Sequence, residues 1–529
     1  MSPVLEQRGE EVAVHDRARG RWLLIAGAVA FALVVAGWAA YDLRRASDWT
    51  LYPVDFDVYR DGGLILRHIS PPYNPKFADP LYGWSRTALL PFTYPPFAAA
   101  VFAVVSFVPP VADPRLTELV NVVALVGAAW CTMRALGWTG WRVRLGGALL
   151  GAAVGLLTEP VFRTIYLGQI NIVLMLMIIW DLTQPDTPSS RRWKGILTGV
   201  AAGIKLTPLV FVPYLLLARK FRQAFLMLAG FAGTVAVGFA VVPSGSVDYW
   251  FNGLFAKAGR TGFPGWGGNQ SLRGLVTRLA GSLAAGTVPW LVLAVVVGVA
   301  GLVAAALLSR AGHEMLGLLT AALVGLLDSP ISWDHHWVWV MPGMMAAAHY
   351  AGVGWRSRRG MAADGPHAVI GWRSRRRMAV GDLALAKSTA PPERTASPEQ
   401  EGGPAAGAVP GNAVPGAVGG VVRHGWALAS GCAALVVAGF LAFAPWPGQL
   451  WGAPVLAPGN YTWGLVWAAP DSRVLYYTEY GDKPWYKEYH WHGFQLLAGN
   501  AYVLSGLGVF VVLCVVAATV TRRPRPTAA

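Results

Sequence analysis

Apolar runs of roughly membrane-spanning length alternate with short polar segments along most of the chain. The first run extends from Leu23 to Tyr41. Turns rich in proline, arginine and aromatic residues separate the later runs, which cover residues 93–109, 116–136, 145–157, 170–182, 195–217, 225–242, 291–308, 315–327, 337–345, 426–443 and 494–520. The pattern predicts an all-α polytopic membrane protein with about 10–12 transmembrane helices.

Basic residues at the ends of these runs indicate their orientation. Arg17, Arg19 and Arg21 precede the first run. Because positively charged flanks stay in the cytoplasm, the N-terminus is expected inside and residues 44–92 outside. The same rule places residues 159–171, 249–273 and 328–337 on the outer side.

Two stretches do not fit simple alternation. Residues 93–136 must cross an odd number of times, so one of their two runs is expected to be broken or re-entrant, and the sequence does not say which. Residues 195–217 lie between two basic clusters, so this segment is expected to enter the membrane and return, with Lys205 at its turn. Non-helical backbone at that depth lines a cavity or lies inside protein. Lys205 is therefore expected to face a polar cavity, and snorkelling to the interface is the alternative.

Residues 354–423 differ from the rest of the chain. The segment Gly354-Trp355-Arg356-Ser357-Arg358-Arg359 recurs at residues 371–376, and Ala, Pro, Gly, Glu and Ser dominate the remainder of this stretch. Such a composition buries too little apolar surface to offset its ordering entropy. We expect a membrane core at 1–353 with an outer loop at 44–92, a disordered basic cytoplasmic insert rich in Pro, Ala and Gly at 354–423, and C-terminal transmembrane helices at 424–529 with an aromatic outer loop.

Composition excludes a single soluble globule. Of the 529 residues, 54% are hydrophobic and 13% are charged, whereas soluble domains carry about 25% charged residues. The net charge of +15 does not indicate nucleic acid, because the excess Arg and Lys lie at helix ends and in one loop. Cys131, Cys432 and Cys514 lie inside apolar runs without metal-ligand spacing, so they indicate packing rather than disulfides or a metal site.

Polar residues suited to chemistry gather in the outer segments. Asp55 and Asp57 come soon after the first run, at the water-facing lip of the bilayer, where a base can reach a lipid-linked substrate. Solvation of an ordinary loop is the alternative interpretation. The other candidates are hydrogen-bonding or charged side chains of the outer turns and of the re-entrant turn: Tyr59, Gln169, Asn171, Lys205, Asn269, Gln270, Asp334, His335 and His336.

Six motifs occur together in the order of one family. They are Asp55-Phe56-Asp57-Val58-Tyr59, Thr93-Tyr94-Pro95-Pro96, Leu167-Gly168-Gln169-Ile170-Asn171, Lys205-Leu206-Thr207-Pro208, Asn269-Gln270-Ser271-Leu272 and Ser329-Pro330-Ile331-Ser332-Trp333-Asp334-His335-His336-Trp337. Over roughly residues 20–350, and again at 485–507, the chain resembles glycosyltransferase family 87. The resemblance implies a GT-C fold with extracytoplasmic catalytic loops. It also implies a polyprenol-phosphate-mannose-dependent α-1,2-mannosyltransferase of actinobacteria in the plasma membrane.

The resemblance further implies roles for the charged candidates. Asp55 matches the family's catalytic aspartate, which acts as a general base on the acceptor hydroxyl. Phosphate is a weakly basic leaving group, so no general acid is needed. The acceptor hydroxyl attacks from the face opposite to the phosphate, so the linkage inverts. Asp57 is then a partner of Asp55 or half of a metal-binding Asp-x-Asp motif. No cofactor is expected, since Lys or Arg can neutralise one phosphodiester. Lys205, His335 and His336 are expected near the donor phosphate or the sugar.

The remaining candidates suit sugar recognition. Gln169, Asn171, Asn269 and Gln270 match sugar hydroxyls, with hydrogen bonds between helices as the alternative; Asp57, Tyr59 and Asp334 are expected to line the same substrate site. Expected partners are the polyprenyl-phosphate-mannose donor, the lipid bilayer and a mannosylated glycolipid acceptor, such as a phosphatidylinositol mannoside or lipomannan/lipoarabinomannan.

Two other functions stay open from the sequence alone. One is a GT-C transferase that uses another polyprenyl-phosphate sugar, such as arabinofuranose. The other is a lipid-sugar flippase or transporter, although such proteins place their sites between repeats near the midplane, and the sequence has no internal repeat of transporter length.

Overall fold

The structure, a computed structural model, describes residues 3–45, 54–67, 80–82, 90–109, 112–363, 443 and 493–521. This part of the chain is helical and contains no strand; Asn269 and Trp333 form an isolated bridge. The predicted all-α class is therefore confirmed. Contacts divide the chain into a large unit, Met1–Ala347 with Leu435–Ala529, and a second unit, Ala348–Ala434.

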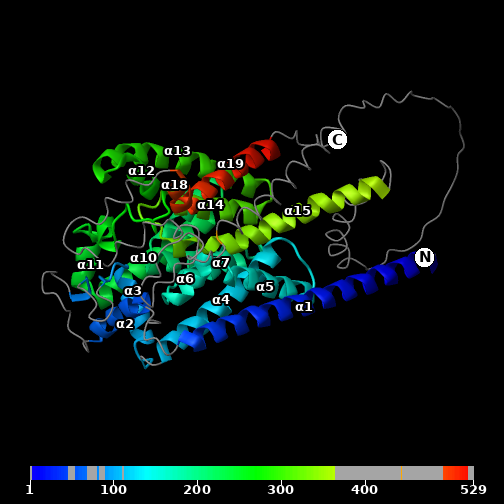
Figure 1. Ribbon diagram of the computed structural model, residues 1–529, viewed down its shortest axis with the longest axis horizontal. Helices are drawn as coiled ribbons and strands as arrows, with labels where there is room; N and C mark the ends of the chain where they lie inside the picture. Colours follow the sequence, from blue (N-terminus) through cyan, green and yellow to red (C-terminus); the bar gives the residue numbers. More distant parts are fainter. Residues whose placement is uncertain are drawn as a thin grey trace, which may run out of the picture. The chain divides into compact units, whose positions relative to one another are not determined.

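The α-helices are numbered along the chain (Figure 1). Their bounds are α1 Pro3–Arg45, α2 Val54–Leu66, α3 Pro96–Val105, α4 Asp113–Ala135, α5 Trp141–Leu156, α6 Glu159–Tyr166, α7 Asn171–Leu182, α8 Ile196–Ile204, α9 Phe211–Leu217, α10 Phe221–Val241, α11 Pro243–Trp250, α12 Leu272–Ala280, α13 Leu283–Arg310, α14 Glu314–Asp328, α15 Val340–Ala363, α18 Gly493–Gly499 and α19 Ala501–Thr521. Two short 3-10 helices also contribute to the site, η4 Thr207–Val210 and η7 Asp334–Trp339.

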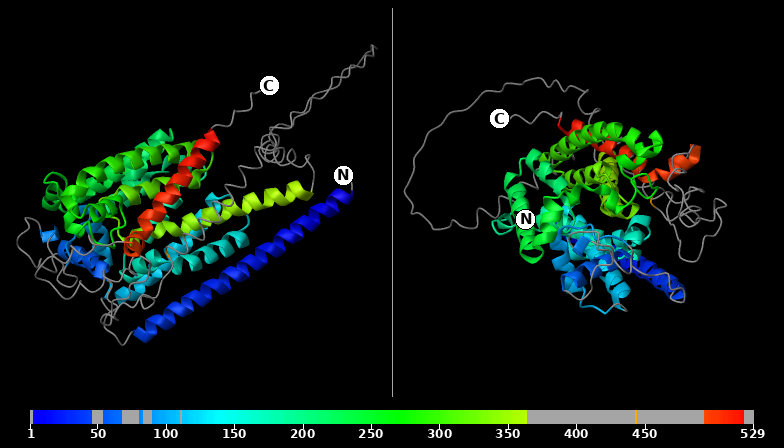
Figure 2. Two further views of the ribbon diagram at one scale, coloured as in Figure 1. Left: turned by 45° about the horizontal axis from the view of Figure 1, so that its top comes forward. Right: turned by 90° about the vertical axis from the view of Figure 1, so that its left-hand side faces the viewer.

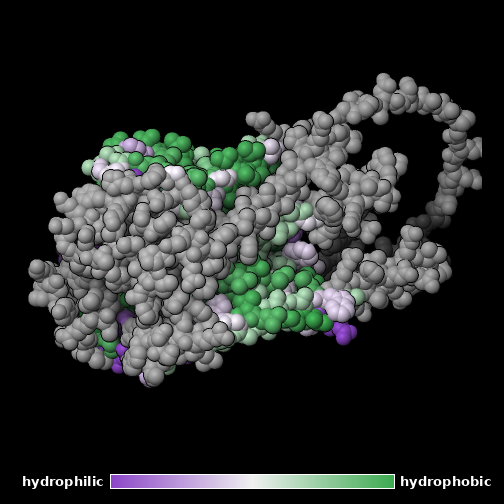
Figure 3. Space-filling view, viewed as in Figure 1, coloured by the Kyte–Doolittle hydropathy of each residue, from purple (hydrophilic) through white to green (hydrophobic). Residues whose placement is uncertain are grey.

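Five of the described helices are long and apolar enough to cross a membrane. They are Gly20–Ala40 within α1, Pro114–Ala135 in α4, Phe221–Val241, Leu283–Arg310 and Ala501–Val520. The α5–α6 pair, bent by 79°, is a sixth candidate. Large apolar side chains on α1, α13 and α19 are exposed, and they form the green surfaces of Figure 3. Water would not favour so much exposed apolar surface, so these faces suit lipid.

The first span, α1, packs along α5 (Figure 2). A Cβ atom added to Gly27 would lie 2.2 Å from the carbonyl oxygen of Gly146, and one added to Gly146 would lie 2.6 Å from the carbonyl oxygen of Leu23. Small residues permit such close approach of helices in membranes. The contact holds α1 against the helix that leads into α6.

The structure decides which of the two runs between residues 93 and 136 is short. α3 has 10 residues and α4 has 23, and only α4 has the length of a span. Pro96 starts α3, where a missing N–H costs little. α3 packs on α2, and a Cβ on Gly63 would lie 2.4 Å from the carbonyl oxygen of Phe102. This close packing fixes the position of α2, which carries Asp55.

Residues 195–217 fold into a hairpin, the shape that the predicted in-and-out segment requires; its entry into the membrane stays a prediction. α8 runs beside α10 in the same direction, because Gly195 lies next to Gln223 and Gly203 lies next to Thr234. The helix ends at Lys205, whose backbone is extended (φ −147°, ψ 127°). η4 and α9 then lead back to the start of α10. The turn therefore places Lys205 far from the end at which the segment enters.

Basic residues gather at one end of the helices, where α4, α7, α9 and α13 end and α5, α10 and α14 begin. We call this the basic end; it carries Arg134, Arg144, Lys194, Lys220 and Arg310. Arg134 contacts the end of α7, and Lys220 pairs with Glu314 at the start of α14. At the opposite end, α5 runs into α6, α7 and α15 begin, and α14 ends. The predicted site residues lie at this opposite end.

α15 continues to Ala363, so residues 354–363, the first part of the predicted insert, are helical in the structure. The predicted domain boundaries themselves stay a prediction. Ala, Met and Arg, which favour helices, make up much of this stretch. The rest of the predicted insert, the aromatic loop 476–491 and nearly all of the run 426–443 lie outside the described residues.

Candidate active site

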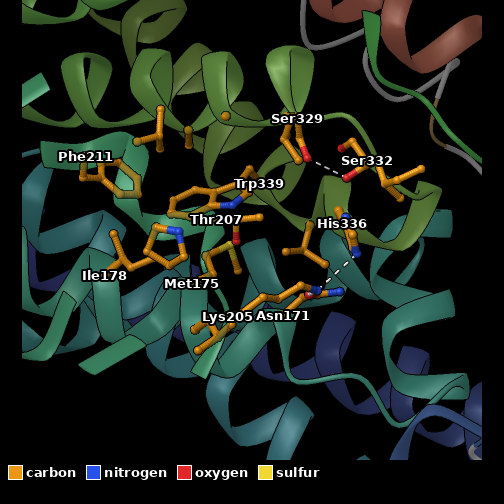
Figure 4. A pocket seen from close by; sticks show the side chains of 18 residues that line it. Asn171, Met175, Ile178, Lys205, Thr207, Phe211, Ser329, Ser332, His336 and Trp339 are labelled. Atoms are coloured by element: carbon orange, nitrogen blue, oxygen red, sulfur yellow. Dashed lines mark hydrogen bonds between the residues drawn. The ribbon is translucent and has the colours of Figure 1, made fainter. Parts of the chain in front are cut away.

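Lys205 is the centre of a polar cluster built from three elements. Its Nζ donates a hydrogen bond of 2.8 Å to Asn171 Oδ1, at the start of α7, and lies 3.1 Å from His336 Nε2, in η7. The three side chains point toward one another (Figure 4). The extended backbone at Lys205 ends α8 and turns this lysine toward the starts of the neighbouring helices.

The charge state of the cluster depends on its surroundings. Burial lowers the pKa of His336 well below its ordinary value, and the charges of Lys205 and His335 lower that pKa further. A neutral His336 can accept the Lys205 hydrogen bond at Nε2. Lys205 thus carries the positive charge of the cluster and has two neutral acceptors, so an anion can still bind to it.

The cluster lies at the wall of a small cavity. Residues of α7, η4, α9, α14 and η7 line it (Figure 4). Beyond Lys205 and His336 most of the lining is apolar, including Met175, Ile178 and Phe211. A cavity with one cationic wall and an otherwise apolar lining matches a ligand with a charged head and a hydrocarbon chain.

Asp55 lies in the first turn of α2, beside this cluster. Its backbone N–H donates a 3.1 Å hydrogen bond to the carbonyl oxygen of Leu167, in the turn between α6 and α7. This bond satisfies one of the N–H groups that a helix start leaves without a partner in the helix. The Asp55 carboxylate interacts electrostatically with Lys205 and with Arg163, and the residue is half-buried. Asp55 is therefore a carboxylate that interacts with two cationic groups of the site.

Tyr59 and Gln169 attach α2 to the same turn. The Tyr59 hydroxyl donates a 2.6 Å hydrogen bond to Gln169 Oε1 and lies 3.0 Å from the Tyr94 hydroxyl. Its ring stacks on Phe102, with centroids 4.2 Å apart. Tyr59 and Gln169 are 1% and 4% exposed. In this structure the two side chains position α2, and the predicted contact of either with a sugar stays a prediction.

Asp57 does not share a face with Asp55. Both lie in the first turn of α2, and side chains two positions apart on a helix point in different directions. Asp57 is 3% exposed, whereas Asp55 is half-buried. The helical backbone therefore disfavours a metal held jointly by the two carboxylates. Among the residues that the structure describes, no group of three or more His, Cys, Asp or Glu side chains could hold a metal ion.

The segment Asp334–His336 is held in place by hydrogen bonds from both sides. The carbonyl oxygen of His335 accepts bonds of 2.9 Å from Asn171 Nδ2 and 2.7 Å from Thr164 Oγ1. Asp334 Oδ1 accepts bonds from the backbone N–H of His335, at 2.7 Å, and from its Nδ1, at 3.0 Å. Burial alone would raise the pKa of Asp334, but Arg163 and His335 hold that pKa well below its usual range. Asp334 is thus a fixed anion that orients His335.

Asn269 and Gln270 lie farther back, in the loop before α12, and both are 0% exposed. The Asn269 side chain donates to the carbonyl oxygens of Pro264 and Pro330 and accepts from the Ser332 N–H. The Gln270 side chain bonds to backbone groups of the loop and of the α18–α19 junction. These bonds within the protein are closer to the alternative role, hydrogen bonding between helices, than to sugar binding. A contact with sugar hydroxyls stays a prediction.

Some residues of the site were not recognised as candidates from sequence. Glu159, Arg163 and Thr164 all belong to α6, and Tyr502 belongs to α19. Glu159 and Arg163 are four residues apart on a helix within an apolar region, a spacing that allows an ion pair. That spacing could have identified Glu159 and Arg163 from the sequence. No local pattern marks Tyr502, because its partner lies 343 residues away in the chain.

Comparison with known proteins relates the chain to glycosyltransferases. Residues 92–330 match glycosyltransferase family 87. The chain is 39% identical over 295 residues, 55% of its length, to the "Polyprenol-phosphate-mannose-dependent alpha-(1-2)-phosphatidylinositol pentamannoside mannosyltransferase" of Mycobacterium tuberculosis (strain CDC 1551 / Oshkosh), of which it covers 65%. A protein of the same name from Mycolicibacterium smegmatis (strain ATCC 700084 / mc(2)155) is 36% identical over 56% of this chain and 69% of that protein.

A third relative is matched over more of its length. The "Polyprenol-phosphate-mannose-dependent alpha-(1-2)-phosphatidylinositol mannoside mannosyltransferase" of Mycobacterium tuberculosis (strain ATCC 25618 / H37Rv) is 31% identical over 361 residues, 66% of this chain and 81% of that protein. No solved structure matches. With the family match and this coverage, the chain belongs to glycosyltransferase family 87.

Proposed function

We propose that the protein transfers mannose from polyprenol-phosphate-mannose to a phosphatidylinositol mannoside and forms an α-1,2 linkage. The printed names of the three relatives support this donor and acceptor. One observation carries the proposal for this chain. The Asp55 carboxylate interacts electrostatically with Lys205, and Lys205 lies at the wall of an otherwise mostly apolar cavity. A base, a phosphate-binding cation and a place for hydrocarbon are thus adjacent.

The donor phosphate binds at Lys205. The ammonium group forms a charge-assisted hydrogen bond to a phosphate oxygen, which is stronger than its present bonds to the neutral Asn171 and His336. The first isoprene units of the donor enter the cavity beside Met175, Ile178 and Phe211. This arrangement directs the mannosyl group toward Asp55.

Asp55 acts as the general base. Its carboxylate takes the proton of the acceptor hydroxyl as the hydroxyl oxygen bonds to the anomeric carbon. The bond from that carbon to the phosphate oxygen breaks on the opposite face, and polyprenol phosphate leaves with the electron pair. A β-linked donor therefore gives an α-linked product, by the geometry of inverting glycosidases. Phosphate needs no proton to leave, so one carboxylate is enough.

The reaction requires no divalent metal in this proposal. Lys205 neutralises the donor phosphate, and Arg163 lies near Asp55 as a second cation. The helical spacing of Asp55 and Asp57 disfavours joint chelation. We expect EDTA to leave the transfer rate within about twofold of the untreated rate, because the side chains of Lys205 and Arg163 supply the positive charge that a metal ion would otherwise provide. A loss of activity that Mg²⁺ or Mn²⁺ restores would refute this part.

The site faces the extracytoplasmic side of the plasma membrane in this proposal. Arg134, Arg144, Lys194, Lys220 and Arg310 lie at the end of the helices away from Asp55 and Lys205. Positively charged ends remain in the cytoplasm. A lipid-linked donor displayed on the outer leaflet would reach the cavity from the membrane.

The test is a transfer assay with purified protein in lipid nanodiscs. Radiolabelled polyprenol-phosphate-mannose and a phosphatidylinositol mannoside are supplied, and the linkage of the product is determined by exo-mannosidase digestion. The wild type should form an α-1,2-linked product. Asp55→Asn should lower kcat by at least about a hundredfold, since a positioned base contributes roughly 10²–10⁴-fold.

Asp248→Asn is the matched control, because Asp248 lies on α11 and its side chain bonds to Asn252. Its transfer rate should equal that of the wild type. Full activity of Asp55→Asn would remove Asp55 as the base. If the wild type used polyprenol-phosphate-arabinose and not the mannosyl donor, or moved labelled lipid across the membrane without transfer, the proposed reaction itself would be wrong.

A further inference from the structure

A buried chain of polar contacts leads from the C-terminal helix to the site. The Tyr502 hydroxyl, on α19, donates a 2.7 Å hydrogen bond to Glu159 Oε2, on α6. Arg163 Nε lies 3.6 Å from Glu159 Oε1 and 3.4 Å from Asp334 Oδ2. α6 therefore links α19, through Glu159, with the segment that carries Asp334, through Arg163.

The far end of this chain of contacts is the lysine cluster. Asp334 accepts two hydrogen bonds from His335, and the next residue, His336, contacts Lys205 Nζ at 3.1 Å. A shift of Asp334 must therefore move His336. The position of the Lys205 ammonium group depends on His336 and on Asn171, which also holds the carbonyl oxygen of His335.

Packing alone does not explain why the polar side chains of Glu159, Tyr502 and Asp334 are buried. Glu159 and Tyr502 are 0% exposed, and Asp334 is 1% exposed. Replacing buried ionic groups with apolar residues of similar volume is often neutral or stabilising, so burial of charge is weak evidence of a role in stability. What such a network can supply is a preferred relative position of the elements that it joins, through the hydrogen bond from Tyr502 to Glu159 and the ion pairs of Arg163 with Glu159 and Asp334.

The charge balance assigns different roles to the two carboxyl groups. One guanidinium faces both Glu159 and Asp334, and two buried carboxylates would leave a negative charge without compensation. Asp334 accepts two bonds from His335, which favour its ionised form. Glu159 accepts from the neutral Tyr502 hydroxyl. Glu159 is thus the group that can be neutral, and an amide can replace it as a hydrogen-bond acceptor.

We infer that Tyr502, Glu159 and Arg163 are positioning residues that set the location of the Asp334–His336 segment relative to Lys205 and thereby the affinity of the site for the phosphate of the lipid-linked donor. This inference rests on the proposed function in one respect, the assignment of Lys205 to the donor phosphate. It adds that the affinity for the donor depends on a helix from the far end of the sequence.

The test compares donor and acceptor KM values across variants in nanodiscs. Tyr502→Phe and Glu159→Ala should each raise the donor KM by about five- to tenfold and leave the acceptor KM within about twofold, because the displaced groups bind phosphate. Glu159→Gln, which keeps an acceptor for the Tyr502 hydroxyl, should recover most of the affinity lost in Glu159→Ala. Asp334→Asn should not show this recovery relative to Asp334→Ala.

Tyr214→Phe is the matched control. It also removes a buried tyrosine hydroxyl, but from α9, near the basic end, and Tyr214 is 2% exposed. Its two KM values should equal those of the wild type. A purely structural role for Tyr502 would lower the unfolding temperature of Tyr502→Phe without changing the donor KM, and that outcome would overturn the inference.

A binding measurement separates this inference from the proposed reaction. The affinity for polyprenol phosphate, which lacks the sugar, is measured by ligand-dependent thermal shift. Tyr502→Phe should weaken this affinity by the same factor as it raises the donor KM, and Tyr214→Phe should not change it. Equal affinities in the wild type and Tyr502→Phe would refute the positioning role, whichever sugar the enzyme transfers.

Discussion

At the scale of single residues, the site combines a half-buried base with cations that hydrogen bonds hold in place. Asp55 keeps partial exposure, whereas Asp57, two positions later, is 3% exposed. Lys205 has neutral partners, so an incoming phosphate does not need to displace a carboxylate from it. Asp55 and Lys205 could be predicted from the sequence, because a carboxylate next to a candidate membrane span and a lysine inside an apolar segment are rare.

The role of Lys205 can be tested by charge removal. Lys205→Met keeps the length of the side chain and removes the ammonium group, so the donor KM should rise by about tenfold or more. Lys205→Arg should not restore it, since a guanidinium group presents its donors in a different geometry. Initial rates at varied donor concentration measure the effect. Lys257→Met, at an exposed lysine, is the control, and an equal change in both variants would contradict the assignment.

At the scale of elements, the re-entrant segment is fixed at its entrance by a buried carboxylate. Asp181, at the end of α7, is 0% exposed. Its oxygens accept bonds from the N–H groups of Gly195 and Thr198, at 2.9 and 2.8 Å, and from the Thr198 hydroxyl, at 2.7 Å. A carboxylate at the start of α8 also interacts favourably with the helix dipole. Asp181 therefore holds the start of the helix whose end presents Lys205.

Removing this carboxylate should destabilise the segment. Asp181→Ala leaves buried N–H groups without partners, so we expect a loss of about 1–3 kcal/mol in the free energy of unfolding. Denaturant unfolding in detergent, followed by tryptophan fluorescence, measures it. In Asp186→Ala the buried Lys194 keeps its hydrogen bond to the carbonyl oxygen of Gln184, so the loss should be smaller than in Asp181→Ala. Equal stability of the two variants would show that Asp181 does not hold α8.

At the scale of the whole molecule, the last described helices hold the site loops together. Arg278, 2% exposed, donates from Nε to Asn500 Oδ1 at 2.9 Å and from Nη1 to the carbonyl oxygen of Asn269 at 3.0 Å. Gln270 Nε2 donates to the carbonyl oxygen of Gly499 at 2.8 Å. Together with the bond from Tyr502 to Glu159, these contacts make the C-terminal helices part of the support of the site.

The sidedness of the molecule can be tested with single cysteines in a variant without native cysteines. Ser189→Cys and Gln223→Cys lie at the basic end, on either side of the re-entrant segment, and Asn252→Cys lies after α11, at the opposite end. A membrane-impermeant thiol reagent should label Asn252→Cys in intact cells and the other two only after permeabilisation. Labelling of Gln223→Cys from outside would make residues 195–217 a full crossing and place Asp334, His335 and His336 on the side of the membrane away from Asp55.

The sequence by itself determined the properties that depend on local patterns. Apolar runs predicted the helices, flanking arginines predicted their orientation, and two basic clusters predicted the hairpin at Lys205. Asp55 was predicted because its motif recurs in a family. Hydropathy and spacing act over tens of residues at most, which is why these predictions needed no tertiary structure.

Only the tertiary structure decided which polar groups face one another. Asn269 and Gln270 have the composition of sugar-binding residues, but their amides are bonded to backbone groups, some of them more than 200 residues away. The contact of Tyr502 with Glu159 likewise depends on packing between segments that are distant in the sequence. A buried polar group takes whichever partner the fold brings to it, because leaving it without one costs more than any local preference supplies.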